Sequence, residues 1–167
     1  MKKWIFLVCQ ISIVVAYGQN TPCPCCGENY RQFDFWVGDW ETTANGQLAG
    51  TNHIIILQDS CLIQENWKST QGNYTGTSYN FYDPQDNQWH QTWVDNQGQS
   101  LRLSGNLEEG KMILKSGAMK NQNGETVHHK ITWTPDADGT VRQLWESKKE
   151  GSESWQVLFD GIYKKKK

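Results

Sequence analysis

The sequence has little proline, no excess of positive charge and, after residue 18, no apolar stretch long enough to cross a bilayer. Sixteen Lys and Arg residues stand against eighteen Asp and Glu residues, and ten bases remain once Lys2, Lys3 and the run 164–167 are set aside. A protein that binds a nucleic-acid backbone needs a basic face. We therefore expect no nucleic-acid partner and no transmembrane segment in the mature chain.

Sequence signatures of several enzyme classes are also missing. The chain has no Gly-x-Ser-x-Gly turn, no phosphate-binding glycine loop and no His-Glu-x-x-His motif. No window of helical length after the first residues keeps a 3.6-residue apolar period, which excludes a mainly helical fold. The sequence indicates no particular cofactor and no metal site built from histidines and carboxylates.

The first eighteen residues have the features of a secretory signal peptide. Lys2 and Lys3 precede an apolar run, and the small residues Ala16 and Gly18 stand three and one positions before a cleavage point. The mature chain would then begin at Gln19. This pattern predicts a secreted or periplasmic protein.

Removal of this leader leaves four cysteines, an even number, in a compartment where disulfides persist. They are Cys23, Cys25, Cys26 and Cys61. A bridge between the adjacent Cys25 and Cys26 would be strained, so we expect one disulfide that joins Cys61 to one of the other three. It would hold the N-terminal arm, residues 19–32, on the domain. Four thiolates around zinc or copper(I) are the alternative.

The expected barrel domain covers residues 33–163, and from Gly38 onward it repeats one pattern: eight to ten residues rich in Thr, Val, Ile, Tyr and Trp, followed by a cluster of turn residues. Nine turns separate ten expected strands, and connections this short join antiparallel neighbours. An open sheet would leave two exposed edges, whereas a closed barrel has none. We predict an all-β fold, an antiparallel up-and-down meander of about ten strands closed into a barrel, followed by a basic tail at 164–167.

Several polar residues fall on strand faces that are otherwise apolar, because residues two apart share a face. These are Glu65, Gln91, Asp95 and His129, and the faces also carry Trp67 and Trp93. Buried polar groups must bond one another, water or a ligand. A self-satisfied polar layer is one reading, and a ligand pocket walled by tryptophans, with Trp145 as a further member, is the other.

The segment Phe33-Asp34-Phe35-Trp36-Val37-Gly38-Asp39-Trp40 resembles the start of the first strand in the calycin superfamily, which contains lipocalins, fatty-acid-binding proteins and nitrobindins. With Asp59-Ser60-Cys61, the segment from Trp89 to Asp95, and Trp145-Glu146, the chain is similar to a family of secreted, lipocalin-like bacterial proteins of unknown function. The resemblance gives Gly38 and Trp40 the role of closing one barrel end. It also implies that an Arg from a late strand, here Arg142, stacks on Trp40.

These observations lead to a functional expectation. We expect a barrel that binds a small hydrophobic or amphipathic molecule through Glu65, Trp67, Gln91, Trp93, His129 and Trp145. The similarity to nitrobindins implies haem bound by an axial histidine as an alternative. A further alternative is an isomerase or hydrolase that uses Glu65, Asp95 or His129 inside the cavity.

Overall fold

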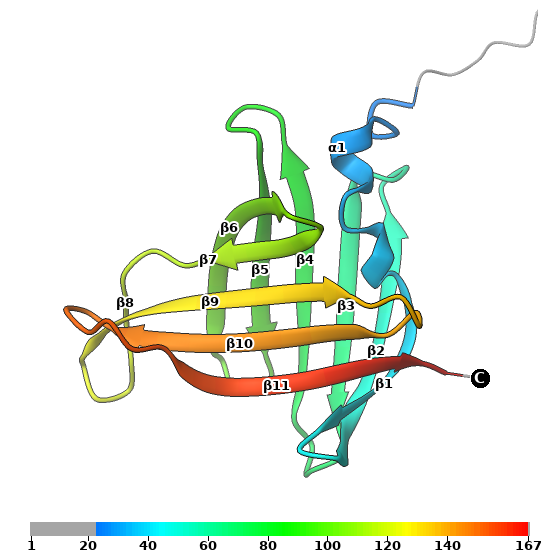
Figure 1. The fold of residues 1–167 in the computed structure, drawn as a ribbon. Helices are drawn as coiled ribbons and strands as arrows, with labels where there is room; N and C mark the ends of the chain where they lie inside the picture. The colour runs from blue at the N-terminus through cyan, green and yellow to red at the C-terminus, as the bar shows by residue number, and fades with distance from the viewer. Residues whose placement is uncertain (1–22, 167) are drawn as a thin grey trace, which may run out of the picture.

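A computed structural model describes residues 23–166, and it is almost entirely β-structure (Figure 1). The predicted signal peptide, residues 1–18, lies outside the described residues. A short helix and a 3₁₀ turn precede eleven strands. Their bounds are α1 (Glu28–Arg31), η1 (Asp34–Trp36), β1 (Gly38–Ala44), β2 (Gln47–Leu57), β3 (Leu62–Ser69), β4 (Thr75–Asp83), β5 (Gln88–Asp95), β6 (Ser100–Glu108), β7 (Lys111–Lys115), β8 (Met119–Lys120), β9 (Thr126–Pro135), β10 (Val141–Lys149) and β11 (Gln156–Lys165).

Ten of these strands close into one antiparallel barrel, as the sequence predicts. The hydrogen-bonded order runs from β1 to β7, passes to β9, β10 and β11, and returns to β1. The closing pair places Trp40 opposite Lys165 and Ala44 opposite Gly161. The two-residue strand β8 is an addition that pairs only with the start of β9. The last barrel strand runs to Lys165, so it includes two residues of the predicted basic tail.

The turn between β1 and β2 shows how short connections produce this topology. Asn45 and Gly46 both have positive φ, 50° and 76°. A two-residue hairpin needs this conformation at both positions, and Asn-Gly supplies it at the least steric cost. β2 therefore returns directly beside β1, with no helix between them.

Burial confirms most of the faces that alternation predicts. On β5, Trp89, Gln91 and Asp95 are buried, and on β9 the inward set ends with Ile131 and Trp133. On the last strand, alternation predicts that Val157 faces inward with Phe159 and Tyr163, and this is wrong for Val157, whose side chain is 60% exposed. A bulge in the β10–β11 pairing shifts the register there, so Leu158 faces the barrel interior in its place.

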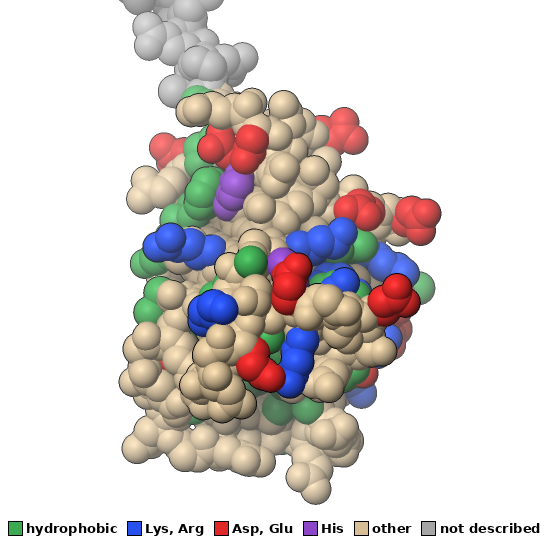
Figure 2. Space-filling view, turned by 90° about the vertical axis from the view of Figure 1, so that its left-hand side faces the viewer, with side chains coloured by type: hydrophobic (Ala, Val, Ile, Leu, Met, Phe, Trp, Pro, Cys, Tyr) green, Lys and Arg blue, Asp and Glu red, His purple; other side chains and the backbone are tan. Residues whose placement is uncertain are grey.

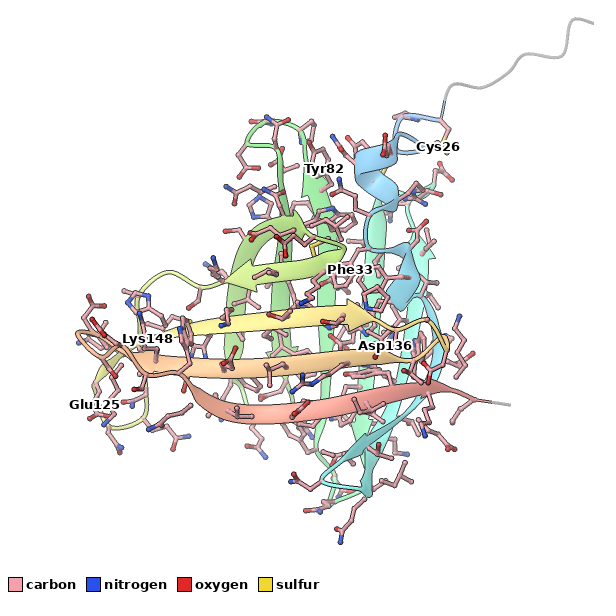
Figure 3. The ribbon with its side chains drawn as sticks, in the orientation of Figure 1. Cys26, Phe33, Tyr82, Glu125, Asp136 and Lys148 are labelled. Atoms are coloured by element: carbon pink, nitrogen blue, oxygen red, sulfur yellow. A yellow bond between two sulfur atoms is a disulfide. The ribbon has the colours of Figure 1, made fainter. Side chains whose placement is uncertain are left out.

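One end of the barrel is closed by aromatic side chains from the N-terminal segment. Phe33 and Trp36 are fully buried, and the Phe33 ring stacks on Trp36 and meets Trp89 and Trp133 edge-on. Figure 3 shows Phe33 and Tyr82 at the end where α1 and Cys26 lie, away from Glu125 and Lys148. The segment before β1 therefore plugs this end, and the wide interior is filled only in part.

Trp40 belongs to this closed end, but the predicted stacking of Arg142 on it is wrong. Trp40 is 1% exposed, and its indole N–H donates to the carbonyl oxygen of Trp36 at 2.8 Å. Arg142 lies on the outer face of β10, where it forms a bidentate ion pair with Asp160. The cation over Trp40 is Lys165, whose Nζ lies 5.0 Å from the ring centroid. Closure of β1 onto β11 brings this residue beside Trp40, because the two are register partners.

Two disulfides hold the N-terminal arm. Cys25 pairs with Cys61, which confirms the predicted bridge to the turn between β2 and β3. Cys23 pairs with Cys26, a second bridge that the prediction of a single disulfide missed. All four sulfurs are thereby used, so the alternative thiolate metal site does not form. Among residues 23–166, no helix is long and apolar enough to cross a membrane.

The two disulfides should contribute unequally to stability, because a longer closed loop restricts the unfolded chain more. Removing the Cys25–Cys61 bridge, which spans 36 residues, with Cys25→Ser and Cys61→Ser should lower the free energy of unfolding by about 4 kcal/mol. The matched pair Cys23→Ser and Cys26→Ser should cost about 2 kcal/mol. Urea denaturation without reductant measures both, and equal losses would contradict the ranking.

A double-mutant cycle can locate the cation over Trp40. We expect Trp40→Ala to cost about 3 to 5 kcal/mol and to couple to Lys165→Ala by about 0.5 to 1 kcal/mol, through the exposed cation–π contact. The same cycle with Arg142→Ala should be additive, because Arg142 faces Asp160. A coupling of Trp40 to Arg142 that exceeds its coupling to Lys165 would argue against this arrangement.

Candidate functional site

The unfilled part of the barrel interior is a cavity of about 320 Å³, called the inner cavity below. Aromatic and aliphatic side chains form most of its wall, and a few polar groups stand among them. Its lining comprises Ala49, Glu65, Trp67, Ser69, Gln71, Tyr74, Gln91, Trp93, Leu101, Ile131, Gln143, Trp145, Leu158, Phe159 and Tyr163. An apolar wall with few polar anchors is typical of small-molecule sites, and this volume lies near the lower end of their range.

Glycines in the barrel wall keep this cavity open. A Cβ at Gly76 would lie 2.0 Å from the Trp93 ring, and one at Gly50 would lie 2.5 Å from the Trp67 ring. Each indole therefore lies against the backbone of a neighbouring strand, in space that any larger residue would occupy. Within β11, a Cβ at Gly161 would meet the Phe159 ring at 2.4 Å, so this glycine makes room for a ring of its own strand. The rings line the wall instead of crossing the interior.

Glu65, on β3, is the buried carboxyl group of the inner cavity. It is 4% exposed, and each of its oxygens accepts one hydrogen bond from a neighbouring strand. Asn52 Nδ2, on β2, donates to Oε1 at 2.7 Å, and Ser78 Oγ, on β4, donates to Oε2 at 2.7 Å. Both donors are neutral. The carboxyl group is thus fixed in position, but its charge is not balanced by either partner.

The hydrogen bonds continue on both sides of Glu65. Asn80 Nδ2 donates to Ser78 Oγ at 2.9 Å, and Gln91 Nε2 donates to Asn80 Oδ1 at 2.7 Å. On the other side, the hydroxyl of Tyr163 donates to Gln143 Oε1. Six strands, β2 to β5 with β10 and β11, therefore supply a polar layer across one part of the barrel. This layer combines both readings of the sequence, because its members bond one another and several of them also line the cavity.

Burial changes the acid–base behaviour of this layer. Loss of hydration raises the pKa of Glu65 from 4.5 to about 7, against the smaller opposing effect of the hydrogen bonds from Ser78 and Asn52. Burial also raises the pKa of Tyr163 well above 10, and the nearby Glu65 adds to this shift. Near neutral pH, Glu65 therefore exchanges a proton while Tyr163 stays a neutral hydroxyl.

The inner cavity opens into a wider vestibule of about 1000 Å³, and the two share Tyr74, Trp93, Leu101, Trp145 and Leu158. The turn between β5 and β6 and residues 119–123 complete the rim. Figure 2 views the molecule from the side of Figure 1 where β8 and the β10–β11 turn lie, and acidic and basic side chains are interspersed on that face. Three ion pairs belong to β9, β10 and their turns: Lys130–Glu146, Lys149–Glu125 and His128–Glu150.

Asp95 lies at the vestibule and has a structural role there. Its Oδ1 accepts the backbone N–H groups of Gln97 and Gln99, both at 2.9 Å, and its Oδ2 accepts the hydroxyl of Tyr74 at 3.1 Å. Burial and the neighbouring Asp95 raise the pKa of Tyr74 to about 12. The Asp95 side chain therefore holds the β5–β6 turn, and it lines the vestibule whereas Glu65 lines the inner cavity.

His129 also lies at the vestibule, and its geometry does not fit the role of haem ligand that the nitrobindin resemblance implies. The indole N–H of Trp145 donates to His129 Nδ1 at 3.1 Å. Because partial burial and the neighbouring His128 lower the pKa of His129, the ring is neutral and its proton lies on Nε2. A metal-bound histidine instead donates from its second nitrogen, so His129 in this state has no nitrogen free for iron.

Five of the six predicted ligand-binding residues line the inner cavity: Glu65, Trp67, Gln91, Trp93 and Trp145. The sixth, His129, lines the vestibule. Sequence reasoning did not name Gln143, Phe159 and Tyr163 as ligand-binding residues, although alternation places Phe159 and Tyr163 on an inward face of the last strand. For β2 and β4, the positions of Gly50 and Gly76 could have identified the inward face. A glycine on that face leaves room for the aromatic ring of a neighbouring strand.

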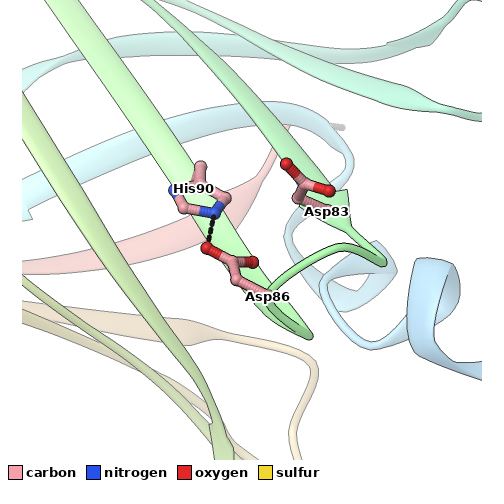
Figure 4. Close-up of side chains that lie close together, drawn as sticks. All are labelled: Asp83, Asp86 and His90. Atoms are coloured by element: carbon pink, nitrogen blue, oxygen red, sulfur yellow. Dashed lines mark hydrogen bonds and ion pairs between the residues drawn. The ribbon is translucent and has the colours of Figure 1, made fainter.

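The other histidines lie outside the barrel. His53 bonds Asp39 at 2.6 Å with most of its side chain exposed. His90 bonds Asp86 at 2.9 Å, and Asp83 stands close by in the only cluster of three possible metal ligands among the described residues (Figure 4). Both carboxylates also accept backbone N–H groups of the β4–β5 turn. The cluster is therefore explained by the turn that it stabilises.

The raised pKa of Glu65 makes a definite prediction about stability. Between pH 4.5 and 7 the folded protein holds a proton on Glu65 that the unfolded chain has released, so stability should fall by about 3 kcal/mol as pH rises through this range. Glu65→Gln should abolish this loss. The variant keeps a partner for its amide, because Asn52 can turn over and accept with Oδ1, a buried atom that lacks a hydrogen bond among residues 23–166.

Chemical denaturation at pH 4.5, 6 and 8 gives the stability difference between Glu65→Gln and the parent protein. The titratable groups nearest Glu65 are Tyr163 and Tyr74, which stay neutral across this range. Glu41→Gln, at an exposed position on β1, removes the same kind of group from solvent and serves as the control. A stability difference between Glu65→Gln and the parent that is the same at all three pH values would disprove the shift.

Comparison with known proteins assigns no relationship: the sequence matches no family model and no curated protein sequence.

Proposed function

We propose that this protein is a calycin-like barrel that binds a small hydrophobic or amphipathic molecule in its inner cavity. The observation that carries the proposal is the way glycines hold the aromatic rings against the wall. The rings of Trp67 and Trp93 could fill the interior, but Gly50 and Gly76 let them lie over neighbouring strands. A purely structural core at native packing density would close such a space.

The polar layer supports the same proposal. A layer that served only stability would place its polar atoms away from the open space, since buried polar groups lower stability unless all their bonds are made. Here Glu65, Gln91 and Gln143 line the cavity. They offer a bound molecule fixed hydrogen-bonding positions beside a large apolar wall.

Catalysis is the second candidate, and the buried carboxyl of Glu65 favours it. A carboxyl group with a pKa of about 7 inside a cavity can both accept and return a proton near neutral pH. The chain would then act as an isomerase or hydrolase with Glu65 as its acid–base group. Asp95 is committed to the β5–β6 turn, so this candidate depends on Glu65 alone.

Export of the protein is part of the proposal. The two disulfides support an oxidising compartment, which agrees with the signal peptide expected at residues 1–18. We propose that the mature chain is secreted or periplasmic and meets its ligand there.

Native mass spectrometry of protein purified from its own source tests the binding proposal. We expect an organic adduct of fixed mass on the parent protein. Trp93→Ala should lose this adduct or bind it at least about fivefold more weakly, because one aromatic contact supplies about 1 kcal/mol beyond area burial. An absorption scan of the same sample would reveal haem.

Trp155→Ala is the matched control, because that indole lies outside the barrel under Lys130 and Lys148, whose Nζ atoms are 4.4 and 5.3 Å from its ring. It should keep the adduct. An adduct that survives Trp93→Ala and is lost in Trp155→Ala would place binding on the outer surface. Protein free of adduct that also binds no member of a panel of fatty acids, aromatic compounds and amines would refute the proposal.

A further inference from the structure

The inner cavity has an unusual charge distribution for a site that takes amphipathic molecules. Fifteen residues line it, and Glu65 is the one whose charge changes near neutral pH. The two tyrosines of the lining, Tyr74 and Tyr163, stay neutral. No Lys, Arg or His is part of this lining. A ligand that enters meets a carboxyl group and no positive charge.

Glu65 also has no counter-charge in the polar layer. Among the ion pairs of residues 23–166, none includes it. Its hydrogen bonds come from an amide and a hydroxyl, and Tyr163 directs its own proton to Gln143. A carboxylate has about four acceptor sites, so about two remain open after Asn52 and Ser78. A buried carboxylate without a cation is costly, and a cation supplied from outside would remove that cost.

The apolar part of the lining suits the same partner. The faces of indole and phenyl rings carry partial negative charge and attract a cation that has lost its water. Trp67, Trp93 and Phe159 line the cavity together with Glu65. A carboxylate ligand would face the Glu65 carboxyl with no Arg or Lys to receive it.

We propose that the inner cavity takes an organic cation, a protonated amine with an aromatic or aliphatic body, whose ammonium group pairs with Glu65. The body lies against Trp67, Trp93 and Trp145. This inference rests on the proposed binding function and specifies its ligand class. It separates the cavity from one built for fatty acids, which would present a cation to the acid group.

Three probes of matched length test the sign of the charge: 2-phenylethylamine, 2-phenylethanol and 3-phenylpropanoate. Titration calorimetry at pH 8, where Glu65 is ionised and the amine still protonated, should show the amine bound at least about tenfold more tightly than the carboxylate. Tyr74 and Tyr163 face the cavity from the β3–β4 turn and β11 and remain neutral at this pH. Affinity for the amine should fall as pH drops below 7.

Glu65→Gln removes the charge of the carboxyl group but keeps the size of the side chain, so it separates the effect of charge on binding from the effect of cavity shape. We expect this variant to bind the amine at least about tenfold more weakly and the alcohol within about threefold of the parent protein. Trp155→Ala, outside the barrel, should leave the affinities for all three probes unchanged.

The outcomes distinguish this inference from the function on which it rests. Equal or tighter binding of 3-phenylpropanoate, lost in Trp93→Ala, would overturn the cation preference and leave the binding cavity in place. Amine binding that is unchanged in Glu65→Gln would overturn the pairing with Glu65. Failure of all three probes would overturn the inference, and the adduct experiment would then decide the binding function separately.

Discussion

The hydrogen bonds between β1 and β11 are the interaction on which the rest of this structure depends. They join the first and last barrel strands over five register pairs, from Trp40 with Lys165 to Ala44 with Gly161. Without them the meander would be an open sheet with two exposed edges and no interior. With them, every inward residue belongs to one enclosed space, and Tyr163 comes within reach of Asn52 at 3.5 Å. The polar layer around Glu65 is therefore a product of closure.

Glycine and glutamate have complementary effects on the interior. The inward glycines remove volume from the wall, so the barrel keeps a cavity that its many aromatic residues would otherwise occupy. Glu65 then places an ionisable group beside that cavity, at a cost that neighbouring amides and hydroxyls reduce without removing. Residues kept for function often oppose stability in this way. This cost in stability is concentrated in the polar layer, whereas Phe33 and Trp36 at the aromatic closed end contribute packing without burying an ionisable group.

Periodicity and turn chemistry were enough to predict the closed ten-strand barrel and the inward faces of β3, β5 and β9. Some strands are apolar or aromatic on both sides, such as the segment of β2 around Ile54–Ile56, so alternation does not show which of their faces is inward. Asn52 and Asn80 were missed for that reason. The bulge that exposes Val157 depends on pairing between β10 and β11, which local sequence does not specify. The prediction for Arg142 failed because the resemblance implied only an Arg from a late strand. The register between β1 and β11 instead places Lys165 over Trp40.

The disulfide between Cys25 and Cys61 has a consequence for access to the inner cavity. It ties Cys25, in the arm that leads to the buried Phe33 and Trp36, to the β2–β3 turn, which restricts movement of the aromatic plug. The vestibule then offers a way into the inner cavity past Leu158, which is half exposed and borders both spaces. Because Leu158 lines both spaces, a substitution there would alter the passage between them together with the cavity wall.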